Sequence, residues 1–126
     1  MWSANVLTGN EISISGLTAT ALASEFATPV FILDEADFRS RAITWNQTLK
    51  LAFGENAGMV YYAAKAFICT EVARWINEIG IGIDVCTGGE LTVALAGGID
   101  PEKTSMPIPI SLIQRATSVQ INALAA

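Results

Sequence analysis

Short apolar runs alternate with longer segments of helical spacing along most of the chain. Four of these runs have the length and composition of strands, namely residues 29–33, 58–63, 81–85 and 104–110. Helical spacing follows them over residues 35–52, 68–78 and 87–96 and again from Ser111 onward. About four alternations of strand and helix at crossover length predict an α/β fold built on a parallel sheet.

Polar residues and glycines mark the expected ends of these helices. Asp34 stands directly before the 35–52 segment and is expected to cap it. Thr87 and Glu90 have the Thr-x-x-Glu spacing of a capping box at the start of the third helix. Gly97-Gly98 is expected to end that helix, and Pro101 to begin a turn.

The first 26 residues have a different pattern. Val6-Leu7 and the alternating residues 11–14 flank a Gly-Asn pair, which predicts a small hairpin with its turn at Gly9-Asn10. Residues 17–26 then place their apolar positions at the spacing of one helical face. We therefore expect a hairpin and a short helix before the first βα unit.

The sheet could be open or barrelled, and in the barrelled case four βα units are the first half of a TIM-type (β/α)8 barrel. Three regions are expected: the hairpin and helix over residues 1–26, the first βα units over 27–105, and a divergent tail over 106–126. Half a barrel leaves two unpaired sheet edges. On this interpretation the chain is incomplete.

Composition narrows the classes of function. Of the 126 residues, 52% are hydrophobic and 15% charged, which predicts a packed core rather than disorder. The net charge of -5, without any basic run, argues against nucleic-acid and anionic-membrane partners. The start lacks the features of a signal peptide, and no apolar run reaches the about 20 residues of a membrane helix. We expect a cytoplasmic protein.

The content of cysteine and histidine further limits the kinds of catalytic and metal site that the chain can form. Cys69 and Cys86 lack a paired spacing and are expected to be reduced thiols. The chain contains no histidine, which excludes a zinc–histidine cluster and a Ser-His-Asp triad, and no metal site is expected.

Lys65 is the residue whose position suggests chemistry. It follows the 58–63 run and precedes a helix, which in a parallel barrel places it at the carboxyl ends of the strands, where sites are built. Its neighbours on both sides are apolar, and partial desolvation favours the neutral amine that forms an imine. The commoner alternative for a strand-end lysine is a side chain that only reaches the surface.

A resemblance favours the chemical role. The segment from Tyr62 to Gly80 has an aromatic residue three positions before the lysine, a small residue next, set apolar positions and a final glycine. It resembles the pyridoxal 5'-phosphate (PLP) attachment signature of the decarboxylases built like alanine racemase. Residues 27–35 and 83–91 resemble the first and third barrel strands of the branch that decarboxylates diaminopimelate. The resemblance covers roughly residues 6–104.

The resemblance implies a specific reaction. Lys65 would hold PLP, and meso-diaminopimelate would lose carbon dioxide and leave as L-lysine, with the cofactor ring as electron sink. It also implies a small amino-acid substrate and a homo-oligomer, which is a dimer in this family. Two alternatives stay open: a PLP-binding barrel without turnover, and an inert fragment that associates with itself.

Other residues near Lys65 have two possible roles each. Asp84 is expected either to face the cofactor's ring or hydroxyl or to cap the next helix. Gly88 and Gly89 either offer helix N–H groups to an anion or allow a tight passage from strand to helix. Tyr62 either points into the barrel or packs in the core, and Cys86 is expected to be a small buried residue.

The resemblance is expected to end after Ser105. Where the family has a strand and a His-Gly-Asn-Asn-Lys segment, this chain has Met106-Pro107-Ile108-Pro109-Ile110, and two prolines remove hydrogen-bond donors from a strand. The family's glycine-rich phosphate loop, the acidic partner of the pyridine nitrogen and the carboxy-terminal β-domain are also absent from the sequence. A truncated or frame-shifted gene would explain this pattern.

Overall fold

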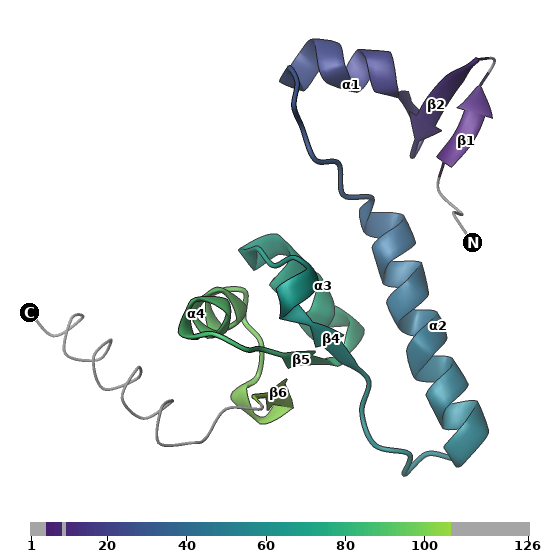
Figure 1. Cartoon of the computed structure of the whole chain (residues 1–126). Helices are drawn as coiled ribbons and strands as arrows, with labels where there is room; N and C mark the ends of the chain where they lie inside the picture. The colour runs from purple at the N-terminus through teal and green to yellow at the C-terminus, as the bar shows by residue number, and fades with distance from the viewer. Residues whose placement is uncertain (1–4, 9, 107–126) are drawn as a thin grey trace, which may run out of the picture. The chain divides into compact units, whose positions relative to one another are not determined.

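The computed structural model describes residues 5–8 and 10–106 of the chain (Figure 1). The chain divides into two compact units, Met1–Thr44 and Trp45–Ala126. Each unit is considered by itself below.

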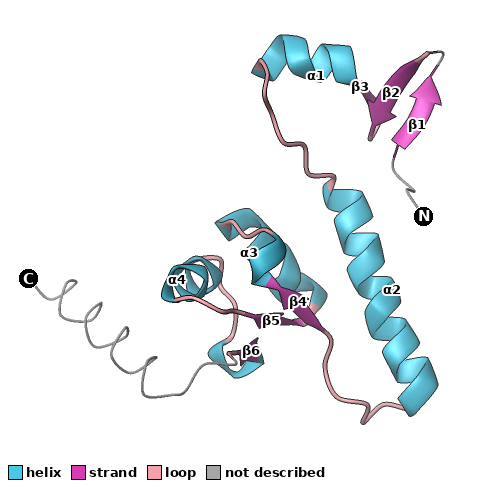
Figure 2. Ribbon diagram, in the orientation of Figure 1, coloured by secondary structure: helices cyan, strands magenta, loops and turns pink. Residues whose placement is uncertain are grey.

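A small antiparallel sheet begins the first unit, and it confirms the predicted hairpin. Its three strands are β1 (Asn5–Thr8), β2 (Glu11–Ile14) and β3 (Leu17–Thr18), in the order β1-β2-β3 (Figure 2). The turn between β2 and β3 places Ser15 at φ 48° and Gly16 at φ 82°. Positive φ at both central residues suits the right-handed twist of a hairpin.

Helix α1 (Ala19–Phe26) starts two residues later than the predicted helix. Leu17 and Thr18 pair with β2 instead, and the Thr18 hydroxyl accepts a hydrogen bond of 3.2 Å from the Ala21 N–H. The cap satisfies one of the N–H groups that the first helical turn leaves without a partner. On the inner face of α1, Leu22 is buried.

The prediction of a buried strand at residues 29–33 is wrong for this chain. Residues 30–34 have no regular secondary structure, and the side chains from Val30 to Leu33 are exposed, Phe31 by 97%. A strand needs a neighbour for its backbone hydrogen bonds. No strand in the described ranges pairs with this run.

Helix α2 (Glu35–Phe53) confirms the prediction to within one residue and has residues in both units. Asp34 caps it as expected, because its Oδ1 accepts a hydrogen bond of 3.0 Å from the Asp37 N–H. Glu35 and Asp37 make ion pairs of 2.7 Å with the arginines four positions later, Arg39 and Arg41. The helix buries none of its residues.

The second unit contains the predicted parallel sheet. Its strands are β4 (Tyr61–Ala63), β5 (Gly82–Asp84) and β6 (Thr104–Ser105), in the order β4-β5-β6. Ala63 aligns with Asp84, and Asp84 with Ser105, so one row of residues crosses the sheet near its carboxyl edge. The rest of the fourth run and the predicted last helix lie outside the described residues.

Besides the last part of α2, the described residues of this unit form further helices and 3-10 turns. They are η1 (Ala64–Ala66), α3 (Thr70–Ile79), α4 (Gly88–Ala96) and η2 (Pro101–Lys103). Both predicted α-helices and the turn at Pro101 are thus confirmed, with ends within two residues of the expected ones. Helix α3 turns its apolar face inward, and the largest fully buried side chains of the described core are Ile76, Ile83, Val72 and Val85.

Close packing between α3 and α4 depends on Gly97. A Cβ atom at this position would lie 2.4 Å from the Ala73 Cβ and 2.7 Å from the Thr70 carbonyl oxygen.

None of the described helices combines the length and the apolar character that a membrane span requires.

Candidate functional site

The carboxyl edge of the β4-β5-β6 sheet brings the predicted site residues to one region. Lys65 lies two residues after the end of β4, and Asp84 is the last residue of β5. Gly88 and Gly89 begin α4, a few residues further on. Because the three strands are parallel, their carboxyl ends share one edge of the sheet. The predicted clustering of these residues follows from that topology.

Lys65 is the middle residue of the 3-10 turn η1. The preceding Ala64 is 2% exposed and anchors the turn, whereas Lys65 itself is exposed. Within the described part of the chain, Lys65 has no hydrogen bond and no ion pair. The expected partial desolvation of its amine is therefore not seen, because the apolar neighbours in sequence do not cover the lysine side chain.

Tyr62 lies on the helix-covered face of the sheet. It aligns with the fully buried Ile83, so the two side chains share a face. Of the two alternatives for Tyr62, the structure therefore supports packing in the core rather than pointing into the barrel. Its hydroxyl donates a hydrogen bond of 2.8 Å to the Phe67 carbonyl. Burial, and to a lesser degree the nearby Cys69 thiol, raises the pKa of Tyr62 above its usual value of 10.0.

Asp84 lies on the face opposite to Ile83, in the row that it shares with Ala63 and Ser105. The residue is half-buried. The alternative that Asp84 caps the next helix is wrong, because the cap of α4 is Thr87. Asp84 thus presents its side chain from the sheet face opposite to the one on which Ile83 is buried.

The start of α4 confirms the expected capping box in a modified form. The Thr87 hydroxyl accepts a hydrogen bond of 3.2 Å from the Glu90 N–H. The Glu90 carboxylate reaches back to the Cys86 N–H, at 2.7 Å, one residue before the cap. The described hydrogen bonds leave the N–H groups of Gly88 and Gly89 without an acceptor.

Gly89 has open space where a side chain would be. A Cβ atom built there would have the Thr87 Oγ1, at 3.9 Å, as its nearest neighbour. Nothing in the described chain therefore requires a glycine at this position for packing. This does not support the interpretation that Gly89 serves a tight passage from strand to helix.

The two cysteines are free thiols, as expected. Both are half-buried, so Cys86 is less enclosed than predicted. The described residues contain no group of three His, Cys, Asp or Glu side chains that could hold a metal ion.

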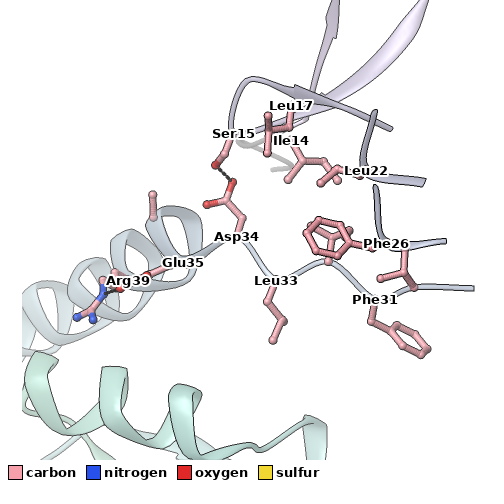
Figure 3. Close-up of a pocket in the computed structure, with 13 residues that line it drawn as sticks. Ile14, Ser15, Leu17, Leu22, Phe26, Phe31, Leu33, Asp34, Glu35 and Arg39 are labelled. Atoms are coloured by element: carbon pink, nitrogen blue, oxygen red, sulfur yellow. Dashed lines mark hydrogen bonds and ion pairs between the residues drawn. The ribbon is translucent and has the colours of Figure 1, made fainter. Parts of the chain in front are cut away.

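The first unit contains a separate hollow of about 740 Å³ (Figure 3). Its walls are mainly apolar, from Ile14, Leu22, Phe26 and the extended residues 30–33. Its rim is polar, where the Ser15 hydroxyl donates a hydrogen bond of 2.6 Å to the Asp34 Oδ2. That bond, followed by the one from the Asp37 N–H, lowers the pKa of Asp34 below 3.8. None of the described residues that line the hollow carries an amine or a thiol for covalent chemistry.

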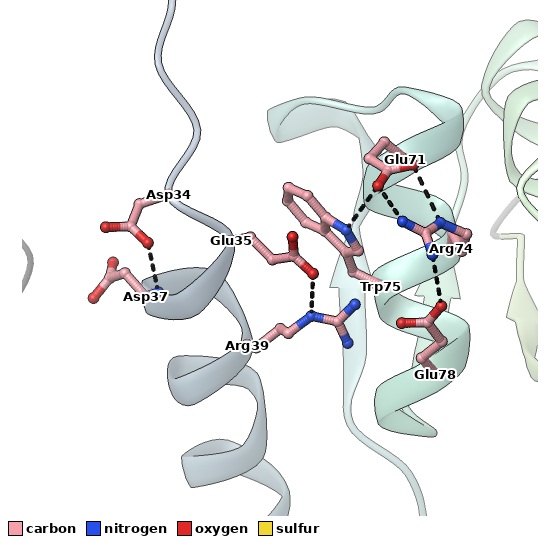
Figure 4. A network of polar contacts seen from close by, with 8 residues as sticks. All are labelled: Asp34, Glu35, Asp37, Arg39, Glu71, Arg74, Trp75 and Glu78. Carbon is pink, nitrogen blue, oxygen red and sulfur yellow. Dashed lines mark hydrogen bonds and ion pairs between the residues drawn. The ribbon is translucent and has the colours of Figure 1, made fainter. Parts of the chain in front are cut away.

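Charged side chains on α3 form a local network (Figure 4). Arg74 pairs with Glu71, and its other nitrogen lies 3.1 Å from Glu78. The Trp75 indole N–H donates to Glu71 at 3.3 Å. These contacts join residues three or four positions apart, so they stabilise the exposed face of the helix.

Comparison with known sequences identifies a family for most of the chain. Residues 35–125 match the family described as "Pyridoxal-dependent decarboxylase, pyridoxal binding domain". The match continues past Ser105, where the resemblance was expected to end.

Proteins similar to this chain include diaminopimelate decarboxylases. The chain is 52% identical to the enzyme of Mycobacterium tuberculosis (strain ATCC 25618 / H37Rv) over 95 residues, which are 75% of this chain and 20% of the relative. It is 50% identical to the enzyme of Mycobacterium leprae over 93 residues, or 74% of this chain and 19% of the relative. The chain spans about a fifth of the length of these relatives.

Solved structures share the fold. A protein of Aquifex aeolicus matches with a TM-score of 0.65 and 28% identity, over 82% of this chain and 24% of the other. The diaminopimelate decarboxylase of M. jannaschii, solved with L-lysine, matches with a TM-score of 0.67 and 24% identity over the same shares. The parallel βα units are therefore part of a TIM-type barrel, as predicted.

Proposed function

This chain belongs to the pyridoxal-dependent decarboxylase family, and from that premise we propose that Lys65 is the residue through which it binds PLP. The observation that carries the proposal is the position of Lys65 just after the carboxyl end of β4, the strand that neighbours β5. This edge is where barrels of this type build their sites. The Lys65 side chain is exposed and has no partner in the described chain, so its amine is accessible to an aldehyde.

The residues around Lys65 fit such a cofactor chemically. An amine attaches covalently to an aldehyde when its nitrogen adds to the carbonyl carbon and the oxygen leaves as water. We propose that Asp84 faces the cofactor's ring or hydroxyl, since it lies on the sheet face opposite to the buried Ile83. When bound, PLP supplies a ring that stabilises the negative charge left on the substrate carbon after carbon dioxide departs.

We propose that Gly88 and Gly89 donate their backbone N–H groups to a polar oxygen of the cofactor or the substrate. Both N–H groups lack an acceptor in the described chain, and the space beside Gly89 is open. The Glu90 carboxylate already lies at this helix end, where it accepts from the Cys86 N–H. A helix start favours negative charge, so these groups suit an anionic oxygen.

For the reaction we propose decarboxylation of meso-diaminopimelate to L-lysine. The supporting observation is that the relatives at 50–52% identity are diaminopimelate decarboxylases. The M. jannaschii protein was solved with L-lysine, which would be the product here. We further propose that the active form is a cytoplasmic homo-oligomer, as in the family that the sequence resembles.

Cofactor binding without turnover is a second candidate for the chain by itself. The exposure of Lys65 favours it, since catalysis depends on a site that excludes water and holds charged groups in place.

One titration tests the attachment. The purified chain is mixed with PLP, and the visible absorbance of lysine-bound PLP is followed for the wild type, Lys65→Ala and the control Lys50→Ala. Lys50 is a suitable control because it is an exposed lysine, paired with Glu55 at 3.0 Å. We expect Lys65→Ala alone to lose the absorbance, and an unchanged signal would contradict the assignment. Carbon dioxide release from diaminopimelate then distinguishes an enzyme from a binder.

A further inference from the structure

The turn that carries Lys65 is held by few contacts. The turn η1 has three residues, and such a short 3-10 segment has little stability of its own. After it, Phe67 is extended (φ -175°, ψ 139°), and α3 begins at Thr70 without a side-chain cap. Before it, Ala64 is buried. Lys65 thus lies between the buried Ala64 and the loop that leads to α3.

The Tyr62 hydroxyl supplies the second anchor. Its hydrogen bond of 2.8 Å to the Phe67 carbonyl spans the turn from one side to the other and encloses residues 63–66 (Figure 1 shows the turn between β4 and α3). Within the described chain, no other side-chain hydrogen bond involves residues 63–69. Loss of this bond therefore frees the Phe67 side of the turn.

The Tyr62 ring is fixed, which makes it a suitable tether. It shares the helix-covered face of the sheet with Ile83, which has no exposed surface. Burial raises the pKa of the phenol, so it keeps its proton at neutral pH and stays a donor. Tyr61 lies on the opposite face and is 45% exposed.

We infer that Tyr62 is a positioning residue for Lys65: its hydroxyl holds the Phe67 carbonyl and thereby fixes the turn that presents the amine. Tyr62 does not touch the cofactor in this scheme. The inference rests on the proposed function, because it assigns Tyr62 a role in the attachment of PLP to Lys65. A neutral hydrogen bond of ordinary net strength corresponds to a factor of about five in an equilibrium.

The test compares Tyr62→Phe with Tyr61→Phe, since each removes one hydroxyl and keeps the ring. The full chain is incubated with PLP, reduced with borohydride at intervals and digested. Mass spectrometry then measures label at the three lysines, Lys50, Lys65 and Lys103. We expect Tyr62→Phe to label Lys65 about fivefold more slowly, with Lys50 and Lys103 unchanged, and Tyr61→Phe to behave as the wild type. Amide exchange of residues 66–68, measured without PLP, should accelerate only in Tyr62→Phe.

The outcomes separate the two proposals. If the wild type labels Lys65 no faster than Lys50, the proposed attachment fails, and amide exchange alone then decides whether Tyr62 fixes the turn. The inference is overturned if amide exchange at residues 66–68 is the same in Tyr62→Phe as in the wild type. It is also overturned if the wild type labels Lys65 faster than Lys50 and Tyr62→Phe labels Lys65 at the wild-type rate. Loss of the protected amides of α3 in Tyr62→Phe also overturns it, because the hydroxyl would then support the whole unit rather than the turn.

Discussion

The runs Val30–Leu33 and Ile81–Val85 are similar short apolar segments, yet one is exposed and the other is buried. Ile83 and Val85 have no exposed surface, because β5 pairs with a strand on each side and packs against α3. Phe31 is 97% exposed, and its segment pairs with no strand of the described chain. The comparison teaches that apolar composition gives a segment a tendency to be buried, and that partners within the chain determine whether burial occurs.

The strongest test of this comparison removes the same atoms from both runs. Ile83→Ala leaves a cavity in a closed core and should cost about 2–5 kcal/mol of unfolding free energy in the second unit. Ile32→Ala removes the same atoms from a side chain that is 36% exposed and should cost less than about 1 kcal/mol. Amide exchange of β5 and α3 measures the first effect, and exchange of α1 the second. Equal costs would show that residues 30–33 are buried in solution.

Two glycines test how tightly the second unit is packed. Gly97→Ala brings a methyl group to 2.4 Å from the Ala73 Cβ, so α3 and α4 must move apart, at about 1–3 kcal/mol. Gly89→Ala meets nothing closer than 3.9 Å and should stay within about 1 kcal/mol of the wild type, on the stabilising side, because alanine favours helix. Urea unfolding followed by circular dichroism compares the pair. A destabilised Gly89→Ala would mean that the space beside Gly89 is not open.

Features that depend on neighbours in sequence could be predicted well. Asp34 and Thr87 mark the starts of α2 and α4 because a cap needs only the next three residues. The parallel order of β4, β5 and β6 follows from the alternation of strands and helices, and it brings Lys65 and Asp84 to one edge. The region of the candidate site was therefore predictable, whereas the roles of its residues stay proposals.

Features that depend on distant or backbone partners could not be predicted. The exposure of Phe31 arises because no strand within residues 5–8 and 10–106 pairs with its segment, and no local pattern reports such a partner. The pair Leu17–Thr18 is too short to give a strand signal, although it pairs with β2. The acceptor for the Tyr62 hydroxyl is the carbonyl of Phe67, and every residue has such a group, so no residue type indicates the bond.

The helix caps of the two units provide a smaller contrast. Thr18, just before α1, and Thr87, just before α4, each accept a hydrogen bond of 3.2 Å from the N–H of the third residue that follows. Thr87→Ala should cost about 1 kcal/mol and reduce amide protection in α4 and in the packed α3. Thr18→Ala should reduce protection in α1 alone, because few buried contacts extend the effect. Serine at either position keeps the hydroxyl and should restore protection; failure to do so would exclude the cap as the cause.

The smallest expected effect is a pH dependence confined to the first unit. The Ser15 hydroxyl, more than the Asp37 N–H, lowers the pKa of Asp34 below 3.8 by stabilising the carboxylate. A lowered pKa in the folded state means that this stabilisation is fully present above pH 3.8 and is lost as the pH falls through the folded pKa. Ser15→Gly removes the hydroxyl and suits the positive φ of 48°, so the pKa should rise toward 3.8 without backbone strain.

Carboxyl chemical shifts in an NMR titration measure the Asp34 pKa directly. Glu11 is the internal control, because its pKa is lowered by hydrogen bonds from Thr20 and should not respond to the change at Ser15. Wild type has more of this stabilisation to lose, so the wild type and Ser15→Gly should differ most near neutral pH and converge in acid. An Asp34 pKa that stays low in Ser15→Gly would assign the shift to the Asp37 N–H. The hydrogen bond at the rim of the hollow would then contribute nothing to the stability of the first unit.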